Sequence, residues 1–218
     1  MIELTRDGDV RILTMDEGEN RFNLTTIAAL HAALDEVEAV EGPCALVTTG
    51  TGKFFSNGLD LDWMMAEPSI PQDFIADVHR LFGRVLALDV YTVAAVNGHA
   101  FAGGAMLAAS HDVTVMRADR GYWCVPEVDL GLPFSPAMFA ALSTHVPPAA
   151  LAEASLTGRR YTAEEAVVAG IAVAAVPDDQ VLAKAIELAA PMAPKNREVI
   201  GAHKQFLFGD AIRTCLGG

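Results

Sequence analysis

Residues 97–106 read Asn97-Gly98-His99-Ala100-Phe101-Ala102-Gly103-Gly104-Ala105-Met106. A strand is expected over residues 92–96, a glycine-rich loop over 97–104 and a helix over 105–110. Consecutive glycines let a ligand approach the backbone closely and permit dihedral angles that other residues avoid. The glycine spacing is neither the GxGxxG dinucleotide fingerprint nor a phosphate loop, which needs Gly-Lys-Ser/Thr. Taken alone, the segment fits tight helix packing slightly better than a binding site.

A second unusual turn lies upstream of this segment. Residues 52–61 read Gly52-Lys53-Phe54-Phe55-Ser56-Asn57-Gly58-Leu59-Asp60-Leu61. An aromatic pair runs into a small polar turn, and a short helix is expected to follow it up to residue 65. Backbone N–H groups at the start of a helix have no intrahelical partner, so they can hold a developing negative charge. An ordinary strand-to-helix loop is the alternative, and the local sequence alone favours it.

A third segment places a carboxyl group among apolar residues. Residues 124–133 read Cys124-Val125-Pro126-Glu127-Val128-Asp129-Leu130-Gly131-Leu132-Pro133. Burial disfavours a charged carboxylate, so we expect a raised pKa for Glu127 and a role in moving protons near neutral pH. A solvated loop acid or a helix N-cap explains the residue equally well. Asp129 is a competing acid that the spacing does not exclude.

The rest of the chain alternates short strands with helices. A hairpin is expected where residues 2–5 and 10–15 flank Asp7-Gly8-Asp9. The further expected elements are a helix over 24–40 capped by Asn23 or Thr25, strands over 45–49 and 113–116, and a mobile surface connection over 67–71. An amphipathic helix is expected over 73–88, with Phe74, Val78, Leu81, Phe82 and Val85 on one face. This alternation without long linkers predicts an α/β fold.

The chain changes character near residue 136, where it becomes helical and rich in alanine. Within this part, Thr162-Ala163-Glu164-Glu165 predicts a capping box, and Gly170 is a candidate helix stop. The predicted division is a core over residues 1–135, holding the active site, and a helical region over residues 136–218.

Composition excludes several classes of function. The 218 residues carry a net charge of −13, and the absence of a Lys/Arg cluster argues against a nucleic-acid partner. The three cysteines, Cys44, Cys124 and Cys215, form no CxxC pair, so neither a disulfide framework nor a metal site is expected. No apolar run approaches the roughly 18–20 residues that a membrane span needs.

Taken in order, the motifs resemble the enoyl-CoA hydratase/isomerase (crotonase) family, and within it the enoyl-CoA delta isomerase group. The resemblance runs from about residue 2 to residue 190. The matching segments are Arg21-Phe22, residues 52–58, Asn97-Gly98-His99-Ala100, Ser110-His111-Asp112, and residues 127–133. The resemblance implies a ββα superhelix with a helical C-terminal region that assembles a homotrimer or a dimer of trimers. It also implies an acyl-CoA substrate and no separate cofactor.

The family's site residues map onto this chain by motif. In the family, two peptide N–H groups form an oxyanion hole for the thioester carbonyl, and here they would belong to Leu59 and Gly103. The family's first motif also lies along the CoA. The residues that this places near CoA are Ser56, Asn57, Gly58, Asp60 and Leu61.

One departure from the family pattern bears on the reaction. Hydratases of the family use two glutamates to position water, whereas this chain has Met106 at the first position and keeps Glu127 at the second. Methionine can neither hold water nor accept a proton. We therefore expect a Δ3-to-Δ2 enoyl-CoA isomerase with Glu127 as its acid/base. The alternatives are another single-acid reaction on acyl-CoA (hydrolase, decarboxylase or lyase) and a non-catalytic acyl-CoA-binding subunit.

Other conspicuous side chains are expected to be structural. Histidines near turns are commonly satisfied by local hydrogen bonds, so we assign structural roles to His99 and His111. Trp63, Met64 and Met65 line an acyl tunnel or pack in the core, and core packing is at least as well supported. The chain ends Leu216-Gly217-Gly218, which is not a peroxisomal tripeptide, and a cytoplasmic location is expected.

Overall fold

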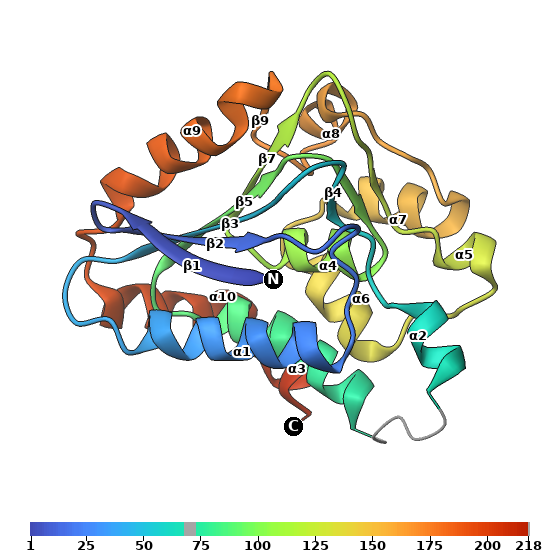
Figure 1. The fold of residues 1–218 in the computed structure, drawn as a ribbon, viewed down its shortest axis with the longest axis horizontal. Coiled ribbons are helices and arrows are strands. Elements are labelled where there is room, and N and C mark those ends of the chain that lie inside the picture. The colour runs from blue at the N-terminus through green and yellow to red at the C-terminus, as the bar shows by residue number, and fades with distance from the viewer. Residues whose placement is uncertain (68–72, 218) are drawn as a thin grey trace.

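The computed structural model describes residues 1–67 and 73–217 (Figure 1). The strands are β1 (Ile2–Asp7), β2 (Val10–Met15), β3 (Ala45–Gly50), β4 (Phe54–Ser56), β5 (Tyr91–Val96), β6 (His99–Phe101), β7 (Val113–Arg117), β8 (Trp123–Cys124) and β9 (Ala174–Val176). The helices are α1 (Leu24–Glu38), α2 (Leu61–Ala66), α3 (Phe74–Ala87), α4 (Gly103–Ala109), α5 (Glu127–Leu130), α6 (Pro136–Ser143), α7 (Pro148–Thr157), α8 (Ala163–Val168), α9 (Asp178–Ala189), a 3-10 turn (Ala190–Met192) and α10 (Arg197–Leu216). The predicted connection over residues 67–71 lies, apart from its first residue, outside the described residues.

The strands form two sheets, and from β3 to β9 consecutive strands alternate between them. The larger sheet has the order β1-β2-β3-β5-β7-β9, with β1 antiparallel to β2 and the other pairs parallel. The smaller sheet has the order β4-β6-β8 and is parallel. Each of three successive turns of the chain therefore gives one strand to each sheet before a helix begins. This arrangement confirms the predicted α/β fold with its ββα repeat.

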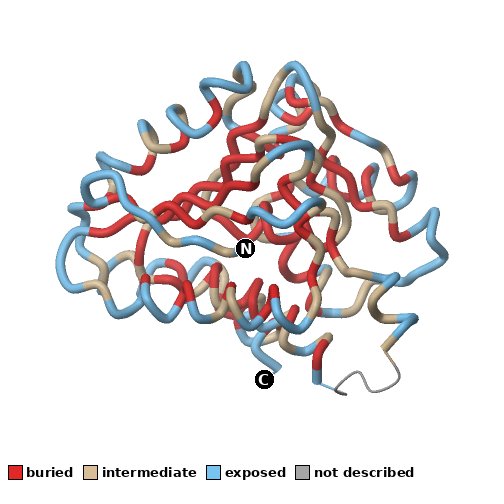
Figure 2. The backbone as a smooth tube through the Cα atoms, viewed as in Figure 1, coloured by how far each residue is buried: buried red, intermediate tan, exposed pale blue. Residues whose placement is uncertain are grey.

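Helices cover both faces of the larger sheet (Figure 1). On one face, α9 packs Val181, Ala185 and Ala189 against the sheet residues Val47 and Val93. On the other face lies the larger core, to which α1, α3, α4 and α6 contribute buried side chains. The buried backbone in Figure 2 follows these two layers, and the helix surfaces that face away from them are exposed.

The predicted boundaries hold for most elements. Asn23 caps α1 by accepting a hydrogen bond from the Thr26 N–H at 3.0 Å, and the Thr162 capping box at α8 is present. The loop predicted over residues 97–104 is wrong in its middle, because β6 occupies it, and β4 was also not predicted. Both strands have three residues, too few to show alternation of apolar and polar side chains.

The region from residue 136 onward packs into the body of the molecule. Its strand β9, which the sequence did not predict, pairs with β7 in the larger sheet. Its last helix, α10, approaches α3 so closely that a Cβ added at Gly83 would lie 2.9 Å from the Cys215 Cβ. The division at residue 135 stays a prediction. No helix within residues 1–67 and 73–217 is long and apolar enough to traverse a lipid bilayer.

Candidate active site

The three unusual segments follow the carboxyl ends of the three strands of the smaller sheet. Residues 57–59 follow β4, residues 102–103 follow β6, and Pro126 and Glu127 come shortly after β8. Because parallel strands end at the same edge of a sheet, these segments meet at one place, and such edges are common ligand sites. The topology thus joins segments that lie up to 70 positions apart in the sequence.

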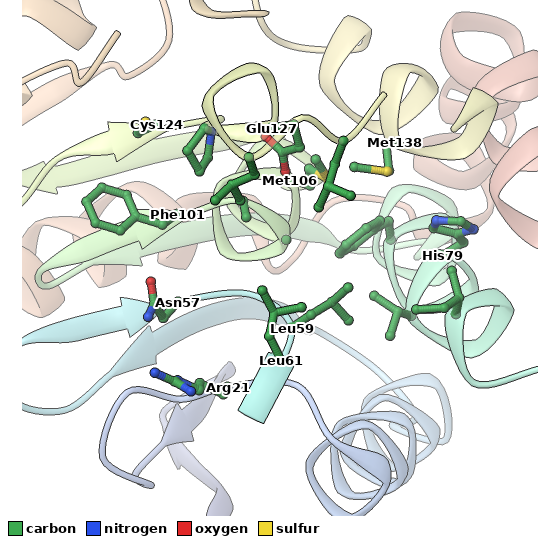
Figure 3. Close-up of a pocket in the computed structure, with 18 of the residues that line it drawn as sticks. Arg21, Asn57, Leu59, Leu61, His79, Phe101, Met106, Cys124, Glu127 and Met138 are labelled. Carbon is green, nitrogen blue, oxygen red and sulfur yellow. The ribbon is translucent and has the colours of Figure 1, made fainter. Parts of the chain in front are cut away.

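A cavity of about 440 Å³ opens at this edge (Figure 3). It is lined by residues from all three segments and from α3 and α6. The lining residues are Arg21, Asn57, Leu59, Leu61, Asp62, Ile75, Val78, His79, Phe82, Phe101, Ala102, Gly103, Met106, Cys124, Pro126, Glu127, Leu130, Leu132, Met138 and Arg160. Figure 3 shows Arg21 and Asn57 on one side of the cavity and His79 and Met138 on the other.

Gly58 allows the first and second segments to touch. Its φ of +75° lies in the left-handed region, and a Cβ added there would lie 2.8 Å from the Gly103 nitrogen. The strand just before each segment is paired, since Ser56 of β4 lies opposite Ala100 of β6. Two hydrogen bonds to Phe22 fix the chain around Leu59: the Phe22 N–H donates to the Gly58 oxygen at 2.7 Å, and the Asp60 N–H donates to the Phe22 oxygen at 3.0 Å.

The N–H groups of Leu59 and Gly103 are both available at the cavity wall. Gly103 is the first residue of α4, so its N–H has no partner within the helix. Among the hydrogen bonds of the described residues, neither N–H acts as a donor. Ala102, just before Gly103, has φ 50° and ψ −120°, a conformation that alanine rarely adopts. The backbone is therefore held in an unfavourable conformation at the point where it presents a donor.

Glu127 begins α5 and points its carboxyl group into the cavity. The residue is 4% exposed, and its buried Oε2 has no hydrogen-bond partner among the described residues. Burial raises the pKa of this carboxyl group from its ordinary value of 4.5 to about 7. In Figure 3, Glu127 and Leu59 lie on opposite sides of the cavity. A substrate lying between them would face a carboxyl group on one side and backbone donors on the other.

The side chains beside Glu127 offer little other acid–base chemistry. Met106, on α4, is buried and lines the same wall. Burial raises the pKa of the Cys124 thiol to about 11, so this group stays protonated near neutral pH. Asp129 is exposed and turned away, since a Cβ added at Gly158 would lie 2.4 Å from its Oδ2. Of the two acids, Glu127 lines the cavity, and Asp129 is not among the described residues that do.

The residues predicted to lie near CoA divide into two groups. Asn57 and Leu61 line the cavity, whereas Gly58 does not line it and lies against Ala102 and Gly103, which do. Ser56 is fully buried, and its hydroxyl donates to the Asn20 oxygen at 2.7 Å and accepts from the Gly58 N–H at 3.2 Å. Asp60 caps α2 by accepting from the Trp63 N–H at 3.2 Å. Ser56 and Asp60 therefore shape the turn, and neither is among the described residues that line the cavity.

The expected local hydrogen bonds are present at His111, whereas the buried Nδ1 of His99 has no hydrogen-bond partner among the described residues. His111 is fully buried between the Leu107 oxygen and the Thr48 hydroxyl, both 2.8 Å away, and burial lowers its pKa to about 4. His99 packs against the rings of Phe54 and Phe101 at centroid distances of 5.2 and 4.9 Å.

The tunnel alternative for residues 63–65 finds no support among the described residues. Trp63 packs edge-on against Phe74, Met64 packs on the core, and Met65 is exposed. None of the three lines the cavity.

Some cavity residues were not identified from the sequence. Val78 and Phe82 were recognised as one apolar face of the helix but not as a cavity wall. His79 and Arg160 had no motif around them, and only their place in the fold brings them to the site. Within the described residues, no group of three or more His, Cys, Asp or Glu side chains is arranged to hold a metal ion.

Comparisons with known proteins agree with this geometry. The model of the enoyl-CoA hydratase/isomerase family matches residues 6–211. Enoyl-CoA delta isomerase 3 of Arabidopsis thaliana is 38% identical over 98% of this chain and 94% of its own length. Carnitinyl-CoA dehydratase of Salmonella typhi is 34% identical over 94% of this chain and 78% of its own length. The crystal structure of a "probable enoyl-CoA hydratase" from Mycobacterium tuberculosis superposes with a TM-score of 0.90 at 27% identity, covering 99% of this chain and 91% of that one. The chain is therefore an enzyme of the enoyl-CoA hydratase/isomerase family.

Proposed function

We propose that this enzyme converts 3-enoyl-CoA thioesters into 2-enoyl-CoA thioesters. Glu127, as a carboxylate, removes a proton from C2. The electrons of that C–H bond then spread over the thioester and the C3–C4 double bond as a dienolate. The protonated Glu127 returns the proton to C4, which leaves the double bond between C2 and C3. The reaction consumes no other reagent.

The observation that carries this proposal is the surroundings of Glu127. A group that removes and returns a proton works best when its pKa lies near the working pH. The pKa of about 7 meets this condition, and it results from burial rather than from a charged neighbour. Among the described residues, Glu127 is the one buried acid, so it has no carboxylate beside it to share the proton.

The backbone donors complete the mechanism. As the C2 proton leaves, negative charge develops on the thioester oxygen, and the Leu59 and Gly103 N–H groups would bind it. Donors already fixed in place stabilise such charge without reorganising, and removing one commonly costs about 100- to 1000-fold in kcat. The position of Ala102 before Gly103 supports this role, because its unfavourable conformation orients the Gly103 amide.

The anionic CoA needs a local cation in a chain of net charge −13. Arg21 is already held by Glu19 and Asp62 at 2.8 and 2.6 Å. Arg160 lies over the Phe101 ring, 5.6 Å from its centroid, and forms no ion pair with a described carboxylate. We assign the CoA phosphates to the side of the cavity near Arg160.

The test is the Glu127→Gln variant, with Asp129→Asn as the matched control on the same helix. Glu127→Gln is expected to lower kcat by about 100- to 10,000-fold and to leave the binding of a saturated acyl-CoA unchanged. Asp129→Asn is expected to retain the activity of the native enzyme. Near-native turnover of 3-enoyl-CoA by Glu127→Gln would show that another group is the base.

Dehydration is the second candidate, because a carnitinyl-CoA dehydratase is among the similar proteins. Met106 argues against it, since a water molecule would have a single acid to hold it. Mass spectrometry of products from 3-enoyl, 2-enoyl, 3-hydroxyacyl and saturated acyl-CoA separates isomerase, hydratase and hydrolase activities. Binding without turnover of any of them would favour the non-catalytic alternative.

We also propose that the enzyme is cytoplasmic and assembles as a homotrimer or a dimer of trimers. The exposed side chains of Phe139 on α6 and of Phe206 and Leu207 on α10 form an apolar surface that assembly would cover. Light scattering coupled to size-exclusion chromatography measures the mass directly. A monomer at micromolar concentration would contradict the assembly.

A further inference from the structure

The part of the cavity lined by α3 and α6, opposite the side assigned to the CoA phosphates, contains one polar side chain that the proposed mechanism does not use. Helix α3 turns Ile75, Val78, His79 and Phe82 toward the cavity. The spacing i, i+3, i+4, i+7 puts these residues on one face of the helix. Three of them are hydrocarbon, as expected for a wall that binds an alkyl chain, whereas His79 is an imidazole.

The imidazole is held in place by the start of α6. His79 Nε2 lies 3.2 Å from the Ser135 hydroxyl, and that hydroxyl also accepts a hydrogen bond from the Met138 N–H at 3.2 Å. The Met138 side chain lines the cavity beside His79, and Figure 3 shows both on the side away from Arg21 and Asn57. The Ser135 hydroxyl thus anchors one ring nitrogen, and no hydrogen bond joins Nδ1 to another described residue.

The ring is neutral in this environment. Burial lowers the pKa of His79, and no charged group contributes to the shift. A neutral imidazole has one donor and one acceptor nitrogen, and the Ser135 hydroxyl can satisfy either tautomer at Nε2. The remaining nitrogen is then an acceptor or a donor. A hydroxyl group is the ligand that suits both cases, since it can donate and accept.

We propose that His79, anchored by Ser135, is a specificity-determining residue that makes the enzyme favour acyl chains carrying a hydroxyl group on their distal part. This inference rests on the proposed function only for its substrate, a 3-enoyl-CoA. A plain alkyl chain packed against His79 removes water from a ring nitrogen without replacing the lost hydrogen bond, which is unfavourable. A hydroxyl at the same place restores the lost hydrogen bond. Sites built to bond a hydroxyl discriminate strongly against analogues that lack it.

The experiment compares acyl-CoA pairs of equal chain length that differ by one hydroxyl. A series of saturated acyl-CoAs with the hydroxyl at successive carbons beyond C5 is titrated by calorimetry into the native enzyme. The same series is titrated into His79→Phe and Ser135→Ala. His203→Phe, which alters an exposed histidine on α10, is the matched control. The corresponding 3-enoyl-CoA pairs are then compared by kcat/KM.

The native enzyme and His203→Phe are expected to bind one or two positional isomers about tenfold more tightly than the plain chain, the effect of one neutral hydrogen bond. His79→Phe is expected to lose this preference while binding the plain chain at least as well. Ser135→Ala is expected to weaken the preference. The inference is overturned if the native enzyme shows no positional preference, or if His79→Phe keeps it.

The binding series separates this inference from the proposed function. Saturated chains cannot isomerise, so their affinities do not depend on which reaction Glu127 catalyses. A preference that depends on His79, found together with no isomerase turnover, would support the specificity site and reject the isomerase. Isomerase turnover without such a preference would support the isomerase and reject the specificity site.

Discussion

Replacing Glu127 by glutamine should stabilise the folded protein at neutral and alkaline pH while it removes activity. The carboxyl group is buried, and its pKa in the folded state is raised from 4.5 to about 7. In the unfolded chain the same group titrates near its ordinary value. Between these two values the folded state binds the proton more tightly, so stability is highest at acid pH and is lost as the pH rises through 7.

The size of the effect follows from the shift. At about 1.4 kcal/mol for each pKa unit, ionised Glu127 destabilises the native enzyme by about 3 kcal/mol at pH 8, and by less than about 1 kcal/mol at pH 5. Glutamine has nearly the same shape and carries no charge at any of these pH values. The difference in unfolding free energy between Glu127→Gln and the native enzyme should therefore grow by about 2.5 kcal/mol from pH 5 to pH 8.

Urea unfolding at half-unit steps of pH measures this difference. Asp129→Asn removes a carboxyl group from the same short helix, but an exposed one, and it corrects for the general loss of a negative charge. The slope of free energy against urea concentration should be the same for all three proteins, since the surface exposed on unfolding is unchanged. A difference between Glu127→Gln and native enzyme that stays constant over this pH range would refute the desolvation of Glu127.

Three further outcomes are expected. The kcat/KM of the native enzyme should rise about tenfold per pH unit below 7 and level off above it, because Glu127 must be ionised to remove the proton, and a pH–rate profile checks this. Gly58→Ala should lower kcat/KM at least about 100-fold with little loss of helical circular dichroism, because its Cβ would lie 2.8 Å from the Gly103 nitrogen. Lys204→Met should lower the free energy of unfolding, measured in urea, by about 3–5 kcal/mol. In the native protein the Lys204 ammonium group lies 2.8 Å from the part-buried Asp112 carboxylate, which the substitution leaves without its charge partner. The double variant with Asp112→Asn should recover part of that loss.

Much of the site could be predicted because its chemistry depends on residue types that packing alone does not explain. A glutamate between proline and valine, and glycines gathered in two turns, are visible without a structure. The order of the segments and the replacement of a second acid by Met106 then pointed to a family and a reaction. The pKa of Glu127 was predicted in direction for the same reason, because burial acts on a carboxyl group in a known sense.

The remaining features depend on contacts between segments distant in the sequence. Ser56 lies in the motif as fully as Asn57 does, yet its hydroxyl faces Asn20 and the Gly58 N–H instead of the cavity. His79 lies on a helix whose apolar face was recognised, and only the approach of Ser135, 56 positions later, shows that its ring is anchored. Short strands such as β6 form because a neighbouring strand provides partners, which local periodicity does not reveal.

At this edge of the small sheet, features that the proposed reaction needs lower the stability of the fold. A buried carboxyl oxygen with no partner among the described residues, at Glu127, and a positive φ at Ala102 each lower the stability of the folded chain. The surrounding structure tolerates them because the strands that carry them are paired and the helices behind them are buried, so the segments have no freedom to relax. The same rigidity keeps the Leu59 and Gly103 amides free of internal partners. A substitution that removes either feature should therefore raise the stability of the folded chain and lower turnover together. Glu127→Gln tests this coupling where the expected change in stability is worked out above.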